Sequence, residues 1–318
     1  MIKGKTKAKL VRTVRSIMKP ETTSGKNYVQ MTTRDSLVVS SKTDPGSRRV
    51  GIYLRGGCDV PAMFAMAPQI QRTIVGTVAI RRDAIPISGS RSDLLLQGLD
   101  GLDSVPREAL ADVSKMLELP KRYFDADLFA PTFDVQRAKG GRRFDKNVIV
   151  LSAGPDFTRS IYRHREYGFL VDPGGYWLNS SMDKVLNDMS LVEAFNKSYR
   201  KVGRMTPARF RELFGRLITE LKTRTGAHIL VLGLMTVDPS DLTHSYRLVR
   251  SADAARRREF MIALAELSRE HSFDVVDVDR LLKLGGIEDQ VDFAHFSQRQ
   301  FEPIGREAYR VLREREIL

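Results

Sequence analysis

The chain has 318 residues, of which 42% are hydrophobic and 29% charged, and this balance excludes a largely disordered protein. A single cysteine, Cys58, excludes a disulfide scaffold and favours a reducing compartment. The formal net charge of +13 favours anionic partners such as nucleic acid, acidic glycans or phospholipid surfaces. No apolar run approaches the roughly 20 residues that span a bilayer, and the start has no signal-peptide core. We therefore expect a cytoplasmic protein without a transmembrane segment.

Residues 1–26 are predicted to form a basic tail, in which seven basic side chains precede the first acidic residue, Glu21. Apolar residues at helical spacing over 8–19 indicate a short amphipathic helix. Two interpretations stay open. The tail is either a peripheral tether to an anionic membrane or nucleic acid, or a solvated, frayed terminus.

Short apolar runs rich in β-branched residues follow from about residue 48. Continuous runs of this kind are typical of strands covered on both faces, as in a parallel sheet. The five predicted strands are Val50–Leu54, Ile74–Ile80, Val148–Leu151, Ile229–Leu232 and Phe273–Val278.

Helical patterns separate these runs, and the alternation predicts a doubly wound α/β fold in one domain over 27–318. Insertions are expected at about 83–146 and 157–206, the second carrying several aromatic residues around His164. Either they build a site at the carboxyl ends of the strands, or they only complete the core. The predicted helices are Pro61–Gln71, Pro106–Leu117, Pro207–Thr223, Ala252–His271 and Glu302–Arg315.

Cys58 is the first candidate for chemistry, because it follows Gly56-Gly57 directly after the first core strand. Adjacent glycines allow a tight turn, and a helix beginning near Pro61 would direct its positive amino terminus at the sulfur. The negative charge of Asp59 opposes this influence of the helix amino terminus on the sulfur. A small buried core residue remains the alternative role for a cysteine here.

Asp292 and His295 form the second candidate, because a carboxylate three residues from an imidazole can orient it as a general base. Asp241 and His244 have the same spacing, so spacing alone does not select the pair. The 292–295 pair is preferred because it lies between the fifth predicted strand and the last predicted helix.

The third candidate is Gly154-Pro155-Asp156 at the end of the third core strand, where a glycine and a polar side chain can line a site. An ordinary strand-end turn is the alternative. Ser36, in Asp35-Ser36-Leu37, is a rival nucleophile, but no helix pattern follows it before the next strand. The strand–nucleophile–helix context therefore favours Cys58.

Together these segments resemble a divergent SGNH, or GDSL-like, hydrolase over about residues 48–316. The resemblance implies a flavodoxin-like three-layer α/β/α sandwich with a five-stranded, mainly parallel sheet. Cys58 stands where the family has its nucleophile serine, Gly89 is nearest to the family's oxyanion-binding glycine, and Asp292 and His295 match its Asp-x-x-His motif. Asp156 stands where the family has an oxyanion-binding asparagine.

The resemblance implies a Cys-His-Asp enzyme of acyl transfer, an esterase, deacetylase or acyltransferase that acts on small acyl groups of carbohydrate or lipid. Gly57, Gly89, Gly154 and Asp156 would line its oxyanion and substrate positions. An ionised Asp156 cannot donate a hydrogen bond to an oxyanion, so it would have to be protonated, replaced by Thr158 or Arg159, or a mark of lost activity.

The alternative is a non-catalytic binding protein of the same fold for an acidic glycan, nucleic acid or anionic membrane. A phosphoryl-transfer enzyme ranks last, because the chain has no P-loop and no acidic cluster suited to magnesium. No cofactor is expected, and the scattered histidines suggest no metal site. Arg256-Arg257-Arg258 is expected to be a solvated helix face.

Overall fold

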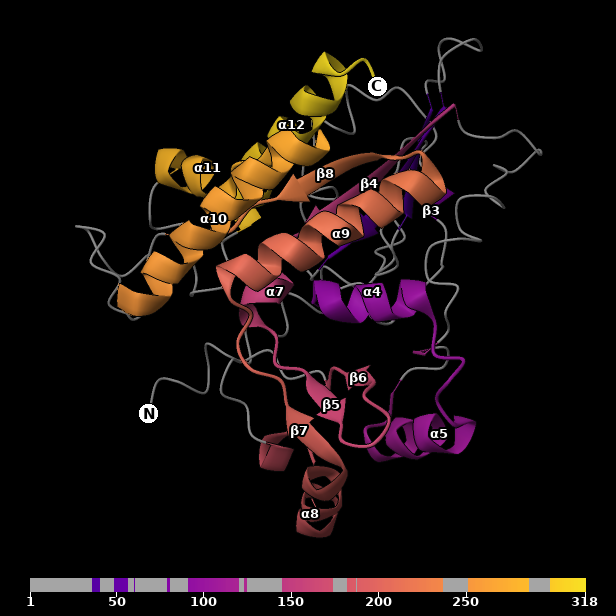
Figure 1. Ribbon diagram of the computed structural model, residues 1–318. Helices are drawn as coiled ribbons and strands as arrows, with labels where there is room; N and C mark the ends of the chain where they lie inside the picture. Colours follow the sequence, from indigo (N-terminus) through magenta and orange to yellow (C-terminus); the bar gives the residue numbers. More distant parts are fainter. Residues whose placement is uncertain are drawn as a thin grey trace, which may run out of the picture.

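The computed structural model describes residues 36–40, 49–56, 60, 79–80, 91–119, 123–124, 145–173, 182–186, 188–236, 251–285 and 298–318. Figure 1 shows a central sheet with helices on both faces and a smaller lobe below α4 and α7. The sheet has six described strands in the order β3-β1-β2-β4-β8-β9. They are β1 (Ser36–Ser40), β2 (Arg49–Arg55), β3 (Ala79–Ile80), β4 (Lys146–Ser152), β8 (His228–Leu232) and β9 (Asp274–Val276).

Each of the five predicted strands contributes to this sheet, and the second does so through Ala79 and Ile80. Strands β2, β4, β8 and β9 are parallel neighbours, and β3 runs in the same direction because β1 is antiparallel to both β2 and β3. With β1 set aside, the five strands have the spatial order 2-1-3-4-5. This is the flavodoxin-like order, and it confirms the predicted fold class.

Strand β1 differs from the five-stranded prediction. It is inserted antiparallel between β3 and β2, with Ser36 opposite Tyr53 and Ser40 opposite Arg49. Its apolar run, Leu37-Val38-Val39, is only three residues long, and its pairing with two later strands is not visible in local sequence. Ser36, the rival nucleophile, is therefore the first residue of a strand and not part of a strand-to-helix turn.

The helices follow the predicted patterns where the structure describes them. Helix α9 (Pro207–Thr225) begins with proline in its first turn, and the Thr206 side chain accepts a hydrogen bond from the Arg209 backbone N–H. It ends at Gly226, whose φ of 62° suits glycine.

Three further predicted helices are present: α5 (Arg107–Met116), α10 (Ser251–His271) and α12 (Gln298–Glu314). The predicted helix Pro61–Gln71 lies outside the described residues. The other helices are α4 (Ser92–Asp100), α7 (Gly154–Thr158), α8 (Met189–Ser198), α11 (Val278–Gly285) and the 3-10 turn η1 (Met182–Lys184).

Two apolar cores make the molecule a three-layer sandwich. On one face, Tyr53, Ile149 and Val231 of the sheet pack with residues of α4, α9 and α10. On the other, residues such as Ile52 and Leu230 pack with α11 and α12. Successive residues of β2, β4 and β8 point alternately into the two cores, so these strands carry continuous apolar runs.

The two insertions meet in the lobe. A three-stranded antiparallel sheet, in the order β6-β5-β7, consists of β5 (Tyr162–His164), β6 (Leu170–Val171) and β7 (Tyr199–Lys201). Its own core includes Val113 of α5 and Phe195 of α8. Gln97 of α4 holds the lobe to the main body, since its side chain accepts from the Leu170 N–H (2.6 Å) and donates to the Leu170 carbonyl (3.0 Å).

Several described aromatic residues of the second insertion pack within the lobe. The Tyr162 ring lies edge-on to Phe195, and the His164 ring stacks on Tyr167 and Phe169. Burial lowers the pKa of His164, and the nearby Glu166 opposes that shift. Tyr162, Phe169 and Phe195 therefore belong to the core of the lobe, whereas Tyr167 is exposed. Among the described helices, none is long and apolar enough to cross a membrane.

Candidate active site

The carboxyl ends of β2 and β4 define the candidate site. These strands are adjacent, with Arg55 opposite Leu151, although β3 and the first insertion separate them in the chain. In the flavodoxin-like order this is the point at which the chain switches sides of the sheet. Ligands of open α/β folds bind in the crevice beyond the carboxyl ends at such a point. The segments that follow β2 and β4 carry two of the three sequence candidates.

Gly56 follows β2 directly and is in close contact with its surroundings. A Cβ atom placed on Gly56 would overlap Cγ2 of Val60 and lie 3.1 Å from Cβ of Ser152 on β4. Val60 is fully buried. Gly56 therefore lies against both Val60 and β4, and the space at this position suits glycine alone. Gly57 and Cys58 lie outside the described residues.

Gly154 and Asp156 lie in the short helix α7, directly after β4. The Gly154 N–H donates to the Ser152 hydroxyl (3.2 Å), and the Ala153 N–H donates to the Leu232 carbonyl (3.1 Å). These bonds fix the turn from β4 beside the end of β8. Asp156 is buried, with 2% of its surface exposed.

The Asp156 carboxylate binds the start of α4. Its Oδ1 accepts hydrogen bonds from the Ser92 backbone N–H (2.9 Å) and the Ser92 hydroxyl (2.6 Å). Burial raises the pKa of Asp156 to about 7, and the two bonds from Ser92 only partly offset this effect. Asp156 is therefore an acceptor that anchors α4, and its protonation state changes near neutral pH.

The donors considered as replacements for an oxyanion-binding asparagine have other partners. The Thr158 hydroxyl donates to the Gly154 carbonyl (2.9 Å). Arg159 lies 3.7 Å from the carboxylate of Asp172, a buried residue of the lobe. Both side chains thus stabilise the segment that leads from β4 into the lobe.

Gly89, Asp292 and His295 lie outside the described residues, as do Asp241 and His244. The contact between Ser92 and Asp156 brings the start of α4, three positions after Gly89 in the chain, to the end of β4. The 292–295 segment lies between α11 and α12 in the chain. A Cβ placed on Gly285, the last residue of α11, would overlap the buried Gln300 side chain of α12, so the described ends of these helices are adjacent.

Two buried arginines near this edge were not expected. Arg55, the last residue of β2, donates to the Leu54 carbonyl (3.0 Å) and lies beside the Tyr53 ring. Arg257 of α10 donates to the Met235 carbonyl (2.9 Å) and lies over the Phe157 ring at 4.9 Å. The prediction of a solvated arginine face on α10 is wrong for Arg257, because a guanidinium can be buried against rings and carbonyls.

Ser92 is the residue of this site that sequence reasoning missed. A serine followed by Asp93 and then Leu94-Leu95-Leu96 is a recognisable helix start, and this pattern could have identified α4. Its contact with Asp156, 64 positions later, has no local signal. Within the described ranges, no three His, Cys, Asp or Glu side chains come together as a metal site.

No family model matches the chain, and neither does any curated protein. Similar solved structures include a lipase/acylhydrolase from Enterococcus faecalis (18% identity, TM-score 0.32), over 54% of this chain and 62% of that one. Phospholipase A1 from Streptomyces albidoflavus is also similar (10% identity, TM-score 0.29), over 55% of this chain and 75% of that one. So is the inhibitor-bound aryl esterase of M. smegmatis (13% identity, TM-score 0.31), over 75% of this chain and 90% of that one.

The chain spans less than two thirds of the lipase/acylhydrolase that it matches. The flavodoxin-like order of the described sheet agrees with the fold that the sequence resemblance implies.

Proposed function

We propose that the protein is an SGNH-like enzyme of acyl transfer that acts on small acyl esters of carbohydrate or lipid. The observation that carries this proposal is the close packing of Gly56 against Ser152 at the switch point of the sheet, because Gly56 precedes Cys58 by two positions in the chain. The Ser92–Asp156 contact supports it, because Ser92, three positions after Gly89 in the chain, lies at the same edge.

In the proposed reaction the Cys58 sulfur attacks the ester carbonyl carbon while His295 accepts the thiol proton. Asp292 orients His295 and stabilises its charged form. The developing oxyanion is held by the backbone N–H groups of Cys58 and Gly89. As the carbon–oxygen bond breaks, His295 returns the proton to the departing alcohol and a thioester remains. Water or an acceptor hydroxyl then releases the acyl group and regenerates the thiol.

The test compares p-nitrophenyl acetate turnover in the wild type, Cys58→Ala and His295→Ala. We expect both variants to fall to the background rate, because each removes a group that acts on the reacting atoms. Ser36→Ala is the matched control and should retain wild-type turnover. Equal rates in the wild type, Cys58→Ala and His295→Ala would refute the catalytic assignment, and loss of turnover only in Ser36→Ala would transfer the nucleophile to Ser36.

A non-catalytic protein that binds an anionic partner is the second candidate. The observation that favours it is the Asp156 carboxylate, which accepts two hydrogen bonds where an esterase of this family presents a donor. On this hypothesis the wild type shows no turnover, but it binds DNA or acidic liposomes at low salt, and deletion of residues 1–26 abolishes the binding. Absence of binding at low salt would contradict it.

A further inference from the structure

One face of the lobe sheet carries three arginines, and we call it the arginine face: Arg163 and Arg165 on or just after β5, and Arg200 on β7. Arg163 is directly opposite Arg200 in the antiparallel register. Flanking bonds run from the Arg165 N–H to the Ser198 carbonyl and from the Val202 N–H to the Ile161 carbonyl, both 2.8 Å. Arg163 and Arg200 are therefore a hydrogen-bonded pair, whose Cα atoms are about 5.5 Å apart.

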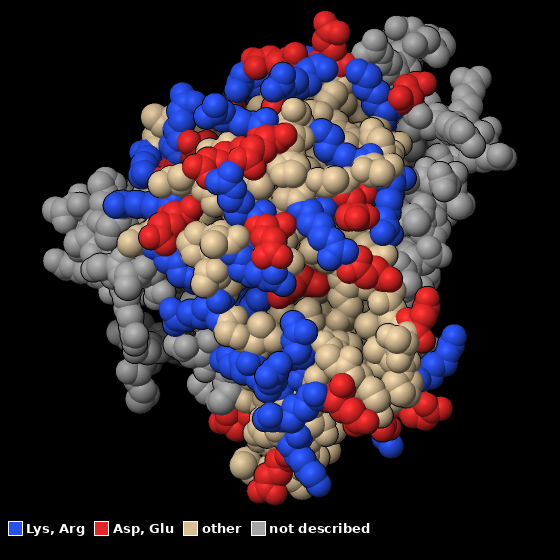
Figure 2. Space-filling model, in the orientation of Figure 1, with Lys and Arg blue, Asp and Glu red and all other residues tan. Residues whose placement is uncertain are grey.

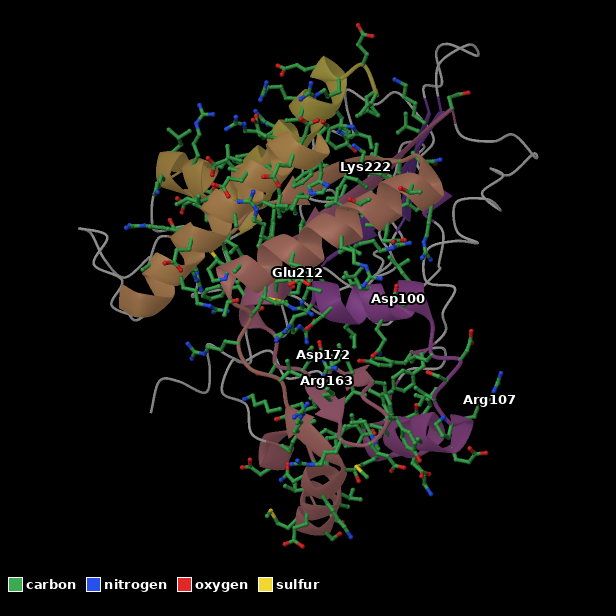
Figure 3. The ribbon with its side chains drawn as sticks, in the orientation of Figure 1. Asp100, Arg107, Arg163, Asp172, Glu212 and Lys222 are labelled. Atoms are coloured by element: carbon green, nitrogen blue, oxygen red, sulfur yellow. The ribbon has the colours of Figure 1, made fainter. Side chains whose placement is uncertain are left out.

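The burial of neighbouring residues shows what each face of the lobe sheet packs against. Tyr162 and Tyr199 belong to the opposite face and are buried in the core of the lobe. Ile161 and Leu170 share the face of Arg163 and are buried in the core of the main body. The arginine face is therefore the face of the lobe sheet that contacts the main body through Ile161 and Leu170, and the arginines lie beyond that contact. Figure 3 shows Arg163 in this region, below α4. Arg163 is half-buried, whereas Arg165 and Arg200 are exposed.

Like charges directly opposite each other on neighbouring strands are destabilising. Among the described residues, Arg163 and Arg200 have no carboxylate partner within ion-pair distance, and Arg165 donates to the Asn196 carbonyl (3.4 Å). The nearby carboxylates are engaged elsewhere: Asp172 lies against Arg159, and Glu166 hydrogen-bonds to Tyr167. In the orientation of Figure 2, basic side chains gather over the β7 side of the lobe.

Exposed arginines in the main body are arranged differently. Most of those on α9 and α12 contact carboxylates within their own helix or on a neighbouring one. Such contacts are made by Arg209, Arg211, Arg216, Arg224, Arg306 and Arg310. The arginine face is thus a local excess of positive charge on a chain that elsewhere places arginine beside acid.

We propose that the arginine face binds a phosphoryl group, which bridges Arg163 and Arg200 with Arg165 at its edge. Guanidinium groups match phosphate oxygens in bidentate pairs, and one dianionic group neutralises the repulsion across the ladder. The group belongs to a soluble phosphorylated ligand or to a lipid headgroup, and the two sources share this chemistry. The site does not depend on the proposed acyl transfer.

The first experiment measures the rise in Tm of the full chain with inorganic phosphate, against chloride at equal ionic strength. We expect a rise for the wild type and about tenfold weaker phosphate binding in Arg163→Gln/Arg200→Gln, since two charge-assisted pairs are lost. In chloride, the double variant should melt at or above the wild-type Tm, because a repulsion has been removed. Arg209→Gln/Arg310→Gln removes the same charge from half-exposed side chains of the main body and should respond like the wild type.

A second experiment separates the two sources by sedimentation with phosphatidylcholine vesicles that contain or lack phosphatidic acid. Recruitment by phosphatidic acid that phosphate competes away, and that Arg163→Gln/Arg200→Gln abolishes, assigns the site to a headgroup. A phosphate response without recruitment assigns it to a soluble ligand. The proposal is overturned if the wild type, Arg163→Gln/Arg200→Gln and Arg209→Gln/Arg310→Gln all respond equally to phosphate.

Discussion

The Asp156→Asn variant should be more stable than the wild type by a few kcal/mol at a pH of about 8, and equally stable at a pH of about 4. Burial raises the pKa of Asp156 to about 7, far above its value in an unfolded chain. Between these two pKa values the folded protein binds a proton that the unfolded chain has lost, so the free energy of unfolding falls as pH rises. An amide stays neutral, and its oxygen can keep both bonds from Ser92.

Urea denaturation across this pH range measures the effect. The wild type should lose stability from its unfolded-state pKa up to about pH 7 and then level off, whereas Asp156→Asn should lack this component. Asp100→Asn is the matched control, because Asp100 is exposed and pairs with Arg216 on the surface. The same pH slope in wild type and Asp156→Asn would show that this carboxyl does not titrate as its burial implies.

The same substitution has a consequence for the proposed chemistry. An asparagine at 156 has an N–H group that can donate to an oxyanion, which an ionised aspartate lacks. Removing one such donor from an established site costs on the order of 100-fold or more in turnover, so adding one should raise p-nitrophenyl acetate turnover by a similar factor. The wild type should approach the variant at lower pH, where Asp156 is protonated.

Gly56→Ala should destabilise the protein by roughly 1–3 kcal/mol and abolish turnover on the proposed function. The new methyl group would overlap Val60, a short, β-branched and fully buried side chain that has no room to move. The clash must therefore displace the backbone between β2 and Val60, which carries Cys58. Urea denaturation and p-nitrophenyl acetate turnover give the two readings.

Gly203→Ala provides the control for this substitution, because a Cβ at Gly203 meets nothing within 4 Å. It should change the free energy of unfolding by no more than about 0.5 kcal/mol. Wild-type stability in Gly56→Ala would mean that the turn yields more readily than its packing indicates.

Strands β2, β4 and β8 were predictable because each is buried on both faces and therefore reads as one apolar run, as in Val148–Leu151. Strand β1 was not, because Leu37-Val38-Val39 becomes a strand only through pairing with β2 and β3. The lobe was foreseen as two insertions but not as one unit. Its core joins Val113 to Phe195, and a contact between segments so far apart leaves no periodic signal in either.

The candidate site was predictable as a location more than as a set of contacts. The positions of Gly56 and Gly154 after their strands indicated the edge of the sheet correctly. The role of Asp156 was not visible, because a carboxylate in a motif looks the same whether it faces a ligand or anchors Ser92. Which arginines are buried could not be predicted either, because the burial of Arg257 depends on its contacts with Phe157 and the Met235 carbonyl.

Strand β1 also determines where the preceding chain, with the predicted basic tail, joins the sheet. Because β1 is antiparallel to β2 and begins at Ser36 opposite Tyr53, the preceding chain enters the sheet at the edge where β2 ends. The ten peptide links from residue 26 to Ser36 reach at most about 35 Å. If residues 1–26 bind an anionic surface, as the second proposed function requires, residue 26 lies within that reach of Ser36, at the edge of the sheet where β2 ends. An ester carried by such a surface would be at a raised local concentration near this edge.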